Sequence, residues 1–279
     1  MSLDPVAVVG ALYTAGERGL AADVLSARAL GLAPMPVCTS IVVAGEGRVT
    51  DVTDVPVDTV HAQLSHLGAA GLLRGIKVGI FGGPKTVEAV CDFIEAASLP
   101  TVMDIVASGP SGETVLSNQG IDAVADRLGV ASMITVSRAD AELITRGQIE
   151  SLDDAQVAAQ RIHNRGAKRV VIRCGYLPYR FYDAASDPGT EAGQMNADLY
   201  FDGQDFALFE ADHLKDTHPD GAASVFAMTV LRGLIDGLGE ESALQAAKRA
   251  ATEAVRLQVD VEGHEPRVQP DWERFQENR

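Results

Sequence analysis

Short runs of β-branched and other apolar residues alternate with longer amphipathic stretches through the first two thirds of the chain. Each run suits a buried strand, and each longer stretch carries apolar residues at helical spacing. Parallel strands joined by crossover helices produce this alternation, so the pattern predicts an α/β fold. The expected strands are Val6–Gly10, Val37–Val43, Ile76–Phe81, Thr101–Ile105, Met133–Val136 and Arg169–Arg173. The expected helices are Leu20–Leu30, Val57–Leu67, Lys85–Ala96, Gly120–Leu128, Arg138–Thr145 and Asp153–Asn164.

The pattern changes after Cys174. A loop rich in Gly, Pro and Asp at 187–193 precedes two short strands, which are separated by a turn at Asp202 and Gly203. Such a strand pair predicts an antiparallel edge on the parallel sheet. Two last helices then complete the core. The strands are expected at Ala197–Phe201 and Phe206–Glu210, and the helices at Ala222–Gly237 and Glu240–Leu257.

The domain organisation follows from the same reading. No internal repeat, low-complexity tract or linker interrupts the chain, so residues 1–259 are expected to form a single domain. Residues 260–279 are polar, contain two prolines and lack periodicity. This tail is therefore expected to be either disordered or a strap across the surface, and Trp272 with Phe275 favours the strap.

Charge and composition restrict the classes of partner. The net charge is −16, which repels nucleic acid and anionic membranes, since both require a basic surface. No apolar run is long enough to span a bilayer, and the first residues lack the basic region of a signal peptide, so the cytoplasm is the expected location. The three cysteines are far apart in apolar segments and are expected to be buried and reduced. Neither a Walker A nor a GxGxxG motif is present.

Three segments place polar or glycine residues at the ends of expected strands. In residues 76–84, IKVGIFGGP, a strand runs into a glycine-rich turn. Asp104 ends the strand at 101–105, where a carboxylate can reach magnesium or serve only as a turn or cap residue. Ser137 and Asp140 follow the next strand and suit ordinary helix capping. Ligands of open α/β sheets bind at this edge, so all three segments are candidate walls of a pocket.

The penultimate helix has a start built from small residues. Residues 221–227 read GAASVFA and lead into Leu231, Gly233 and Leu234. The free N–H groups of a helix start can hold a phosphate group. This segment is therefore a candidate anion site.

Together these blocks resemble the hydroxymethylpyrimidine and phosphomethylpyrimidine kinases of the ribokinase-like superfamily. The turn at 76–84 is similar to that family's KIGMLGS, residues 102–106 to VLDPV, residues 134–143 to TPNxxEAxxL, residues 170–176 to VLVKGGH, and residues 221–227 to GTGDTFxA. The resemblance runs from about Val6 to Val255. It implies a three-layer α/β/α sandwich with a mostly parallel sheet and an antiparallel edge, and an ATP-dependent, Mg²⁺-dependent kinase for a small substrate. The family commonly forms dimers, so a homodimer is possible here, although no feature of the sequence itself indicates one.

The resemblance also implies a role for individual residues. The catalytic group comprises Gly221, Ala222, Ala223, Ser224 and Asp220 at the start of the penultimate helix. The cofactor-binding residues are Ser137, Asp140, Arg173 and Gly175, and the metal ligands are Asp104 and Asp140. The substrate-binding residues are Gly10, Asp23, Ala44, Ile80 and Val106.

The chain departs from the family pattern at the base that accepts the proton of the substrate hydroxyl. Ser224 stands where the family has aspartate or cysteine, and serine is not a base near neutral pH. If nothing replaced the base, the rate would fall by about 10²–10⁴-fold. Asp220 lies just before the helix as one replacement, whereas a shift of the alignment around His218 brings Ala222 opposite the base. The methyl group of Ala223 also narrows the approach to the phosphate.

Three functions remain open at this stage. The first is phosphorylation of hydroxymethylpyrimidine or its phosphate, as in thiamine biosynthesis. The second is pyridoxal kinase activity, since Ala44 falls where the family has a polar residue that reads the pyrimidine, and Tyr13 could stack on a pyridine ring or simply belong to the core. The third is a non-catalytic protein that binds a ligand on the kinase scaffold, which the loss of the base would explain.

Overall fold

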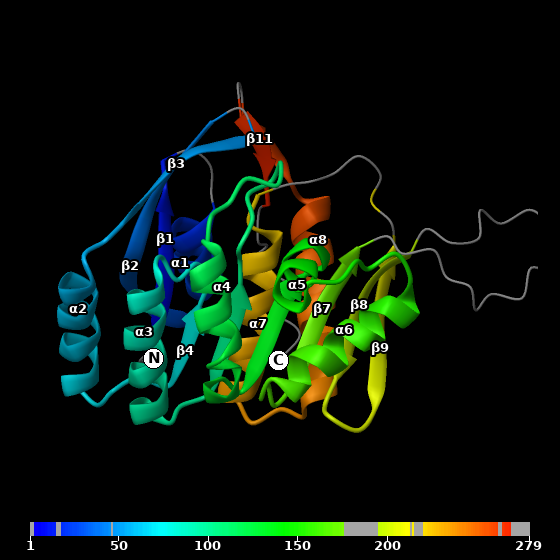
Figure 1. Cartoon of the computed structure of the whole chain (residues 1–279). Coiled ribbons are helices and arrows are strands. Elements are labelled where there is room, and N and C mark those ends of the chain that lie inside the picture. Colours follow the sequence, from blue (N-terminus) through cyan, green and yellow to red (C-terminus); the bar gives the residue numbers. More distant parts are fainter. Residues whose placement is uncertain are drawn as a thin grey trace, which may run out of the picture.

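The centre of the molecule is a sheet of nine strands, in the order β3-β2-β1-β4-β5-β6-β7-β8-β9 (Figure 1). The computed structural model describes residues 3–14, 18–45, 47–175, 195–212, 214, 220–261 and 264–268. Strands β2, β1, β4, β5, β6 and β7 run parallel, while β3, β8 and β9 pair antiparallel with their neighbours. The strands are β1 Asp4–Tyr13, β2 Leu32–Gly45, β3 Arg48–Asp54, β4 Gly75–Val78, β5 Thr101–Ile105, β6 Met133–Ser137, β7 Val170–Gly175, β8 Met195–Phe201 and β9 Phe206–Asp212.

Helices cover both faces of the sheet, which gives the expected three layers (Figure 1). One face packs against α2 to α6 and the other against α1, α7 and α8. Strand β1 explains why both faces are covered, because its apolar side chains alternate between them. Ala7 and Val9 belong to the core under α2 to α6, and Val6 and Val8 to the core under α1, α7 and α8. The helices are α1 Gly19–Ala29, α2 Val57–Ala69, α3 Pro84–Ala97, α4 Asn118–Ala125, α5 Arg138–Thr145, α6 Leu152–Asn164, α7 Ala222–Ile235 and α8 Glu240–Arg256.

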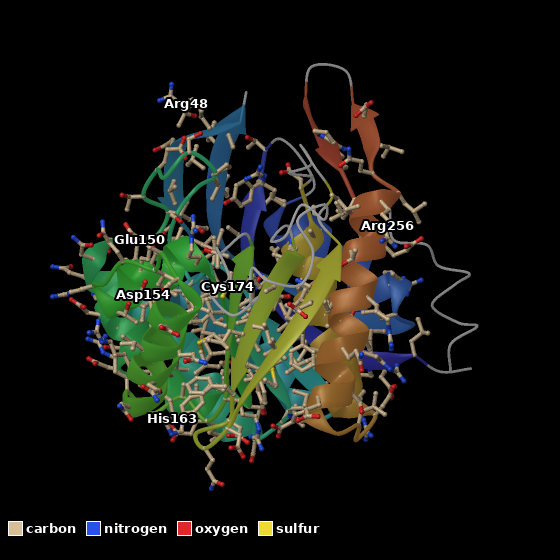
Figure 2. The ribbon with its side chains drawn as sticks, turned by 90° about the vertical axis from the view of Figure 1, so that its right-hand side faces the viewer. Arg48, Glu150, Asp154, His163, Cys174 and Arg256 are labelled. Atoms are coloured by element: carbon tan, nitrogen blue, oxygen red, sulfur yellow. The ribbon has the colours of Figure 1, made fainter. Side chains whose placement is uncertain are left out.

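The predicted fold class is confirmed, including the antiparallel strand pair β8 and β9 at one edge (Figure 2). One strand of the central sheet was not predicted. Strand β3 pairs antiparallel with β2 from Arg48 to Asp54 and makes the opposite edge antiparallel too. Its sequence, RVTDVTD, is exposed along most of its length, so it lacks the apolar run by which buried strands are recognised. The loop expected at 187–193 lies outside the described residues.

The C-terminal segment forms a small hairpin where it is described. Strands β10 (Val259–Val261) and β11 (His264–Arg267) pair antiparallel. The hairpin stands at the end of α8, near the labelled Arg256 (Figure 2). Asp220, just before α7, forms an isolated parallel bridge with Arg267. Trp272 and Phe275, on which the expected strap partly depended, lie outside the described residues.

The expectations about cysteines and membrane spans can be compared with the described part of the chain. Cys91 and Cys174 are buried as expected, whereas Cys38 is partly exposed. Burial raises the pKa of both the Cys91 and the Cys174 thiols to about 12, which keeps them protonated and unreactive. Among the described helices, none combines the length and the apolar character that crossing a bilayer requires.

Candidate active site

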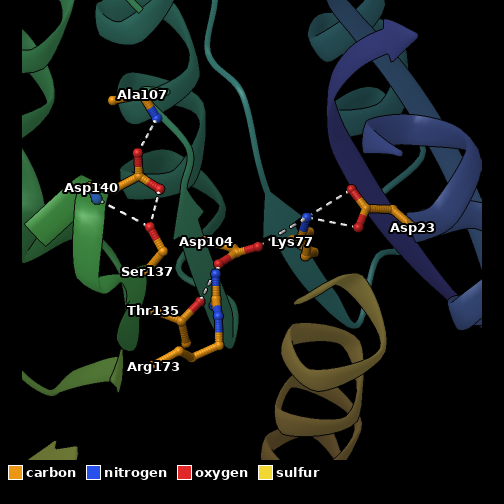
Figure 3. A network of polar contacts seen from close by, with 8 residues as sticks. All are labelled: Asp23, Lys77, Asp104, Ala107, Thr135, Ser137, Asp140 and Arg173. Carbon is orange, nitrogen blue, oxygen red and sulfur yellow. Dashed lines mark hydrogen bonds and ion pairs between the residues drawn. The ribbon is translucent and has the colours of Figure 1, made fainter. Parts of the chain in front are cut away.

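A line of buried, alternating charges crosses the sheet near the carboxyl ends of its parallel strands (Figure 3). Lys77 on β4 is 2% exposed, and its Nζ lies 2.7 Å from each carboxylate oxygen of Asp23 on α1. The same Nζ lies 3.9 Å from Oδ2 of Asp104 on β5. Buried charges of this kind require partners of opposite sign, because the loss of hydration otherwise costs roughly several kcal/mol for each ion.

The line continues on the other side of Asp104. Its Oδ1 accepts hydrogen bonds from Arg173 Nη1 at 2.6 Å and from the Thr135 hydroxyl at 2.8 Å. Neighbouring strands bring these residues together, since Asp104 pairs in register with Thr135. Burial acts to lower the pKa of Arg173, but the carboxylates of Asp104, Asp198 and Asp140 together outweigh it and the pKa is raised. Arg173 is therefore a permanent cation at the end of β7.

Asp23 is the most deeply buried carboxylate of this group, at 0% exposure. Burial raises its pKa above the usual value, while the charge of Lys77 and hydrogen bonds from Lys77 and Ser224 act in the opposite direction. Gly79 leaves room for the Lys77 ammonium group beside Asp23, because a Cβ at this position would lie only 3.1 Å from Lys77 Nζ. Asp23 therefore connects the end of β4 to the beginning of α7.

Asp140 and Ser137 organise a loop beside the charged line (Figure 3). The Ser137 hydroxyl accepts a hydrogen bond from the Asp140 amide at 3.1 Å, which caps α5, and donates one to Asp140 Oδ2 at 2.6 Å. Asp140 Oδ1 accepts hydrogen bonds from the amides of Ala107 and Ser108, both at 3.0 Å, and from the Ser108 hydroxyl at 2.8 Å. Oδ1 of Asp140 thus holds the chain that follows Asp104, while Oδ2 is engaged with Ser137 at the start of α5.

Helix α7 opens toward the same region. Gly221 has a left-handed φ of +95°, which L side chains rarely adopt, and is the N-cap of the helix. Gly221, Ala222 and Ala223 are partly exposed, whereas Ser224 is buried and contacts Asp23. The free N–H groups at a helix start attract anions, and here they are within one turn of the buried charges. Because this helix start is partly exposed, an anion could reach its free N–H groups.

Asp220 is held in place from two sides. Its carboxylate forms an ion pair with Arg18, which precedes α1. Its backbone amide donates to the Pro266 carbonyl at 2.9 Å, and its carbonyl accepts from the Val268 amide at 3.1 Å. Asp220 is therefore 7% exposed and anchored by both the first loop and the C-terminal hairpin.

An apolar cluster lies next to this anchor and contains three of the predicted substrate residues. Tyr13, Ile80 and Val115 form its buried part with Ala11 and Val42, and the partly buried members are Ala44, Val49, Val52 and Val106. Burial raises the pKa of Tyr13 to about 12, with Arg18 lowering and Asp220 raising it. Ala44, Ile80 and Val106 are thus brought together, and Tyr13 with them.

The remaining predicted residues take less central places. Gly175 ends β7 with a φ of +60° and open space around it. Lys77, Thr135 and Arg18 were missed by the sequence analysis. A lysine inside an otherwise apolar strand was the available signal for Lys77, but Arg18 and Thr135 carried none.

The site has different capacities for phosphate and for metal. Cationic side chains and the start of α7 suit a nucleotide phosphate. Within the described ranges, no group of three or more His, Cys, Asp or Glu side chains is placed to hold a metal ion. Mg²⁺ in phosphate-transfer sites uses one or two carboxylates together with phosphates and water, so a group of three such side chains is not required there.

Comparison with known proteins identifies relatives of this chain. The phosphomethylpyrimidine kinase family model matches residues 14–268. The hydroxymethylpyrimidine/phosphomethylpyrimidine kinase of Aquifex aeolicus is 26% identical over 86% of this chain and 90% of its own length. That of Streptomyces coelicolor is 25% identical over 96% and 94%. The Bacillus subtilis pyridoxal kinase, solved as an ADP complex, has a TM-score of 0.83 at 22% identity and covers 98% of this chain and 99% of its own.

Proposed function

The chain belongs to the phosphomethylpyrimidine kinase family, and from this premise we propose that it transfers the terminal phosphate of ATP to the hydroxymethyl group of a small heteroaromatic compound. Hydroxymethylpyrimidine or its phosphate is the first candidate, because the relatives from Aquifex and Streptomyces are named for these substrates. The observation that carries the proposal is the partly exposed start of α7 at Gly221, set beside the buried charges of Asp23, Lys77 and Asp104.

The nucleotide would bind with its terminal phosphate at the N–H groups of Gly221, Ala222 and Ala223. Phosphoryl transfer depends chiefly on position and on charge stabilisation, which these amides and Arg173 supply. Asp104 is the proposed protein ligand of Mg²⁺, which supplies charge neutralisation on the phosphates when it is bound. Asp140 and Ser137 would act by holding the loop at 107–108 beside the site.

Ser224 is the proposed residue next to the substrate hydroxyl. The Ser224 side chain lies close enough to Asp23 to lower the pKa of that carboxyl group, so a carboxylate stands behind the position where the family has its base. A proton released by the substrate can reach Asp23 through the Ser224 hydroxyl. The burial that raises the Asp23 pKa makes this carboxylate a better proton acceptor than an exposed one. Asp220, whose carboxylate is paired with Arg18, is then a structural anchor.

The proposal is tested by ADP release in the presence of ATP and Mg²⁺. The panel comprises hydroxymethylpyrimidine, its phosphate, pyridoxal and pyridoxine, and we expect turnover with at least one pyrimidine. Omission of Mg²⁺ should abolish it. Calorimetry with a non-hydrolysable ATP analogue separates the alternatives, since tight binding without ADP release would identify a ligand-binding protein that has lost catalysis. No binding and no turnover would exclude the kinase proposal.

Pyridoxal kinase activity is the second candidate. The apolar cluster around Tyr13 and Ala44 favours it, because apolar surroundings of this kind would offer few hydrogen bonds to an aminopyrimidine. The structure of a Staphylococcus aureus pyridoxal kinase with AMP-PCP and pyridoxal is 24% identical, with a TM-score of 0.81 over 96% of this chain and 94% of its own. The panel decides between the two substrates by the ratio of kcat/KM.

Substitution of Ala44 provides a prediction about this selectivity. Ala44→Gln adds a donor and an acceptor at the partly buried edge of the apolar cluster. We expect kcat/KM for hydroxymethylpyrimidine to rise about tenfold relative to that for pyridoxal, the size of one net hydrogen bond (roughly 1 kcal/mol or somewhat more). Ala44→Leu is the matched control, which adds bulk without hydrogen bonds. Equal selectivity in both variants would show that Ala44 does not face the substrate ring.

A further inference from the structure

Residues 264–268 lie beside Asp220, the residue that directly precedes the proposed phosphate site. In this subsection the name strap refers only to these five described residues. Two backbone hydrogen bonds join them to Asp220, from Asp220 N to Pro266 O and from Val268 N to Asp220 O. The strap and Asp220 are far apart in sequence, so this contact is a tertiary one. It fixes the peptide units on both sides of Asp220.

The second of these bonds has a direct geometric consequence. The Asp220 carbonyl and the Gly221 N–H belong to the same peptide plane, and the described residues contain no cis peptide bond. In a trans peptide the C=O and the N–H point in opposite directions. A carbonyl held toward the Val268 amide therefore turns the Gly221 N–H away from the strap. The strap sets the direction of the first amide of the helix start.

Packing keeps the strap in place. Val268 is 6% exposed and forms a cluster with Val225 on α7 and with Ala250 and Ala254 on α8. Val225 follows Ser224 in the first turns of α7, so the same few residues of the strap contact both the backbone and the side chains at the start of the helix. The ion pair between Arg18 and Asp220 adds a third attachment from the first loop.

We infer that the strap is a positioning element of the phosphate site, which aims the Gly221 N–H through the hydrogen bond from Val268 N to Asp220 O. This inference rests on the proposed function, because it assigns the Gly221 amide to a nucleotide phosphate. The C-terminal segment thereby has a role in phosphate binding, although none of its residues is expected to contact a ligand. The strap acts through Asp220, so Val268 is a positioning residue.

The test compares two substitutions of one residue in the full chain. Val268→Pro removes the N–H donor and keeps most of the apolar side chain, whereas Val268→Ala keeps the donor and loses two methyl groups. A misdirected Gly221 amide loses a hydrogen bond to a charged phosphate, so we expect Val268→Pro to weaken binding of AMP-PCP and to raise the KM for ATP by about tenfold or more. In Val268→Pro, the KM for the second substrate should change by less than about threefold. In Val268→Ala, the affinity for AMP-PCP and both KM values should change by less than about threefold.

Circular dichroism and thermal melting establish that both variants are folded. A folded Val268→Pro variant that binds AMP-PCP as tightly as the wild type would overturn the inference and leave the kinase proposal intact. Equal losses in both variants would also overturn it, because packing alone would then explain them. A wild-type chain that does not bind AMP-PCP would overturn both proposals.

A measurement on the unaltered chain keeps the inference testable if Val268→Pro does not fold. Hydrogen exchange followed by mass spectrometry reports peptides that cover 220–224 and 264–268. When AMP-PCP is added, we expect amide protection to rise in both segments, because a phosphate on the Gly221 amide fixes the peptide unit that Val268 contacts. Protection that rises at 220–224 and stays unchanged in the strap would refute the coupling.

Discussion

Replacing Lys77 with methionine is expected to lower the free energy of unfolding by about 3–5 kcal/mol at neutral pH. Lys77 is the partner of Asp23, and it also lies 3.9 Å from Asp104. All three residues are at most 2% exposed. Removal of the cation leaves a buried carboxylate without its compensating charge, which is among the largest effects that one substitution has on stability. Urea denaturation followed by circular dichroism measures it.

The pH dependence of this loss has a definite sign. Burial raises the Asp23 pKa, and Lys77 counteracts that shift, so the pKa rises further in Lys77→Met. A carboxyl group whose folded pKa exceeds its unfolded value contributes stability below the unfolded pKa and loses it as the pH rises through the folded pKa. The difference in unfolding free energy between wild type and variant should therefore shrink as the pH falls from neutral into the mildly acidic range.

Two further variants make the Lys77 prediction specific. Lys85→Met removes a lysine that is exposed in the first turn of α3, and it should change stability by less than about 0.5 kcal/mol. The double variant Asp23→Asn with Lys77→Met replaces the ion pair by neutral groups of similar size, so it should recover much of the lost stability. A Lys77→Met protein as stable as the Lys85→Met control would contradict the buried pair.

The fold could be predicted from sequence because its elements carry strong local patterns. Apolar strands such as 101–105 and amphipathic helices such as 84–97 have a period that needs no knowledge of tertiary contacts. Strand β3 escaped because an exposed edge strand has no such run. The position of β3 is set by its pairing with β2, and the residue pattern of β3 alone does not reveal this pairing.

The residues of the candidate site could be proposed from the sequence, but most of the contacts among them could not. The strand ends at Asp104 and Ser137 and the helix start at Gly221 were identified by spacing and resemblance. The pairing of Lys77 with Asp23 joins residues 54 positions apart, and no local pattern specifies it. Asp140 combines both cases: its helix-cap contact with Ser137 is local and follows from the sequence, whereas its hydrogen bond from the Ala107 amide joins distant residues and does not.

Substitution of Ser224 tests the proposed proton path from the substrate hydroxyl to Asp23. Ser224→Ala removes the hydroxyl that contacts the Asp23 carboxylate and changes little else, since the side chain is small and buried. We expect kcat to fall by about 10²–10⁴-fold, the usual range for general acid–base assistance. The affinity for AMP-PCP should be unchanged, because the phosphate is held by backbone amides that alanine retains. Steady-state kinetics and calorimetry measure the two effects separately.

Ser224→Asp distinguishes a proton path through serine from a simple loss of the base. If the base were merely missing, aspartate would raise kcat at neutral pH. The structure predicts otherwise, because the new carboxylate would lie against Asp23, and like charges so close raise the pKa of one of them. We therefore expect the kcat of Ser224→Asp at neutral pH to stay below that of the wild type and to increase with pH as the second carboxyl group ionises. A Ser224→Asp enzyme that exceeds the wild type at pH 7 would contradict the path through Ser224 and favour direct action of a carboxylate at this position.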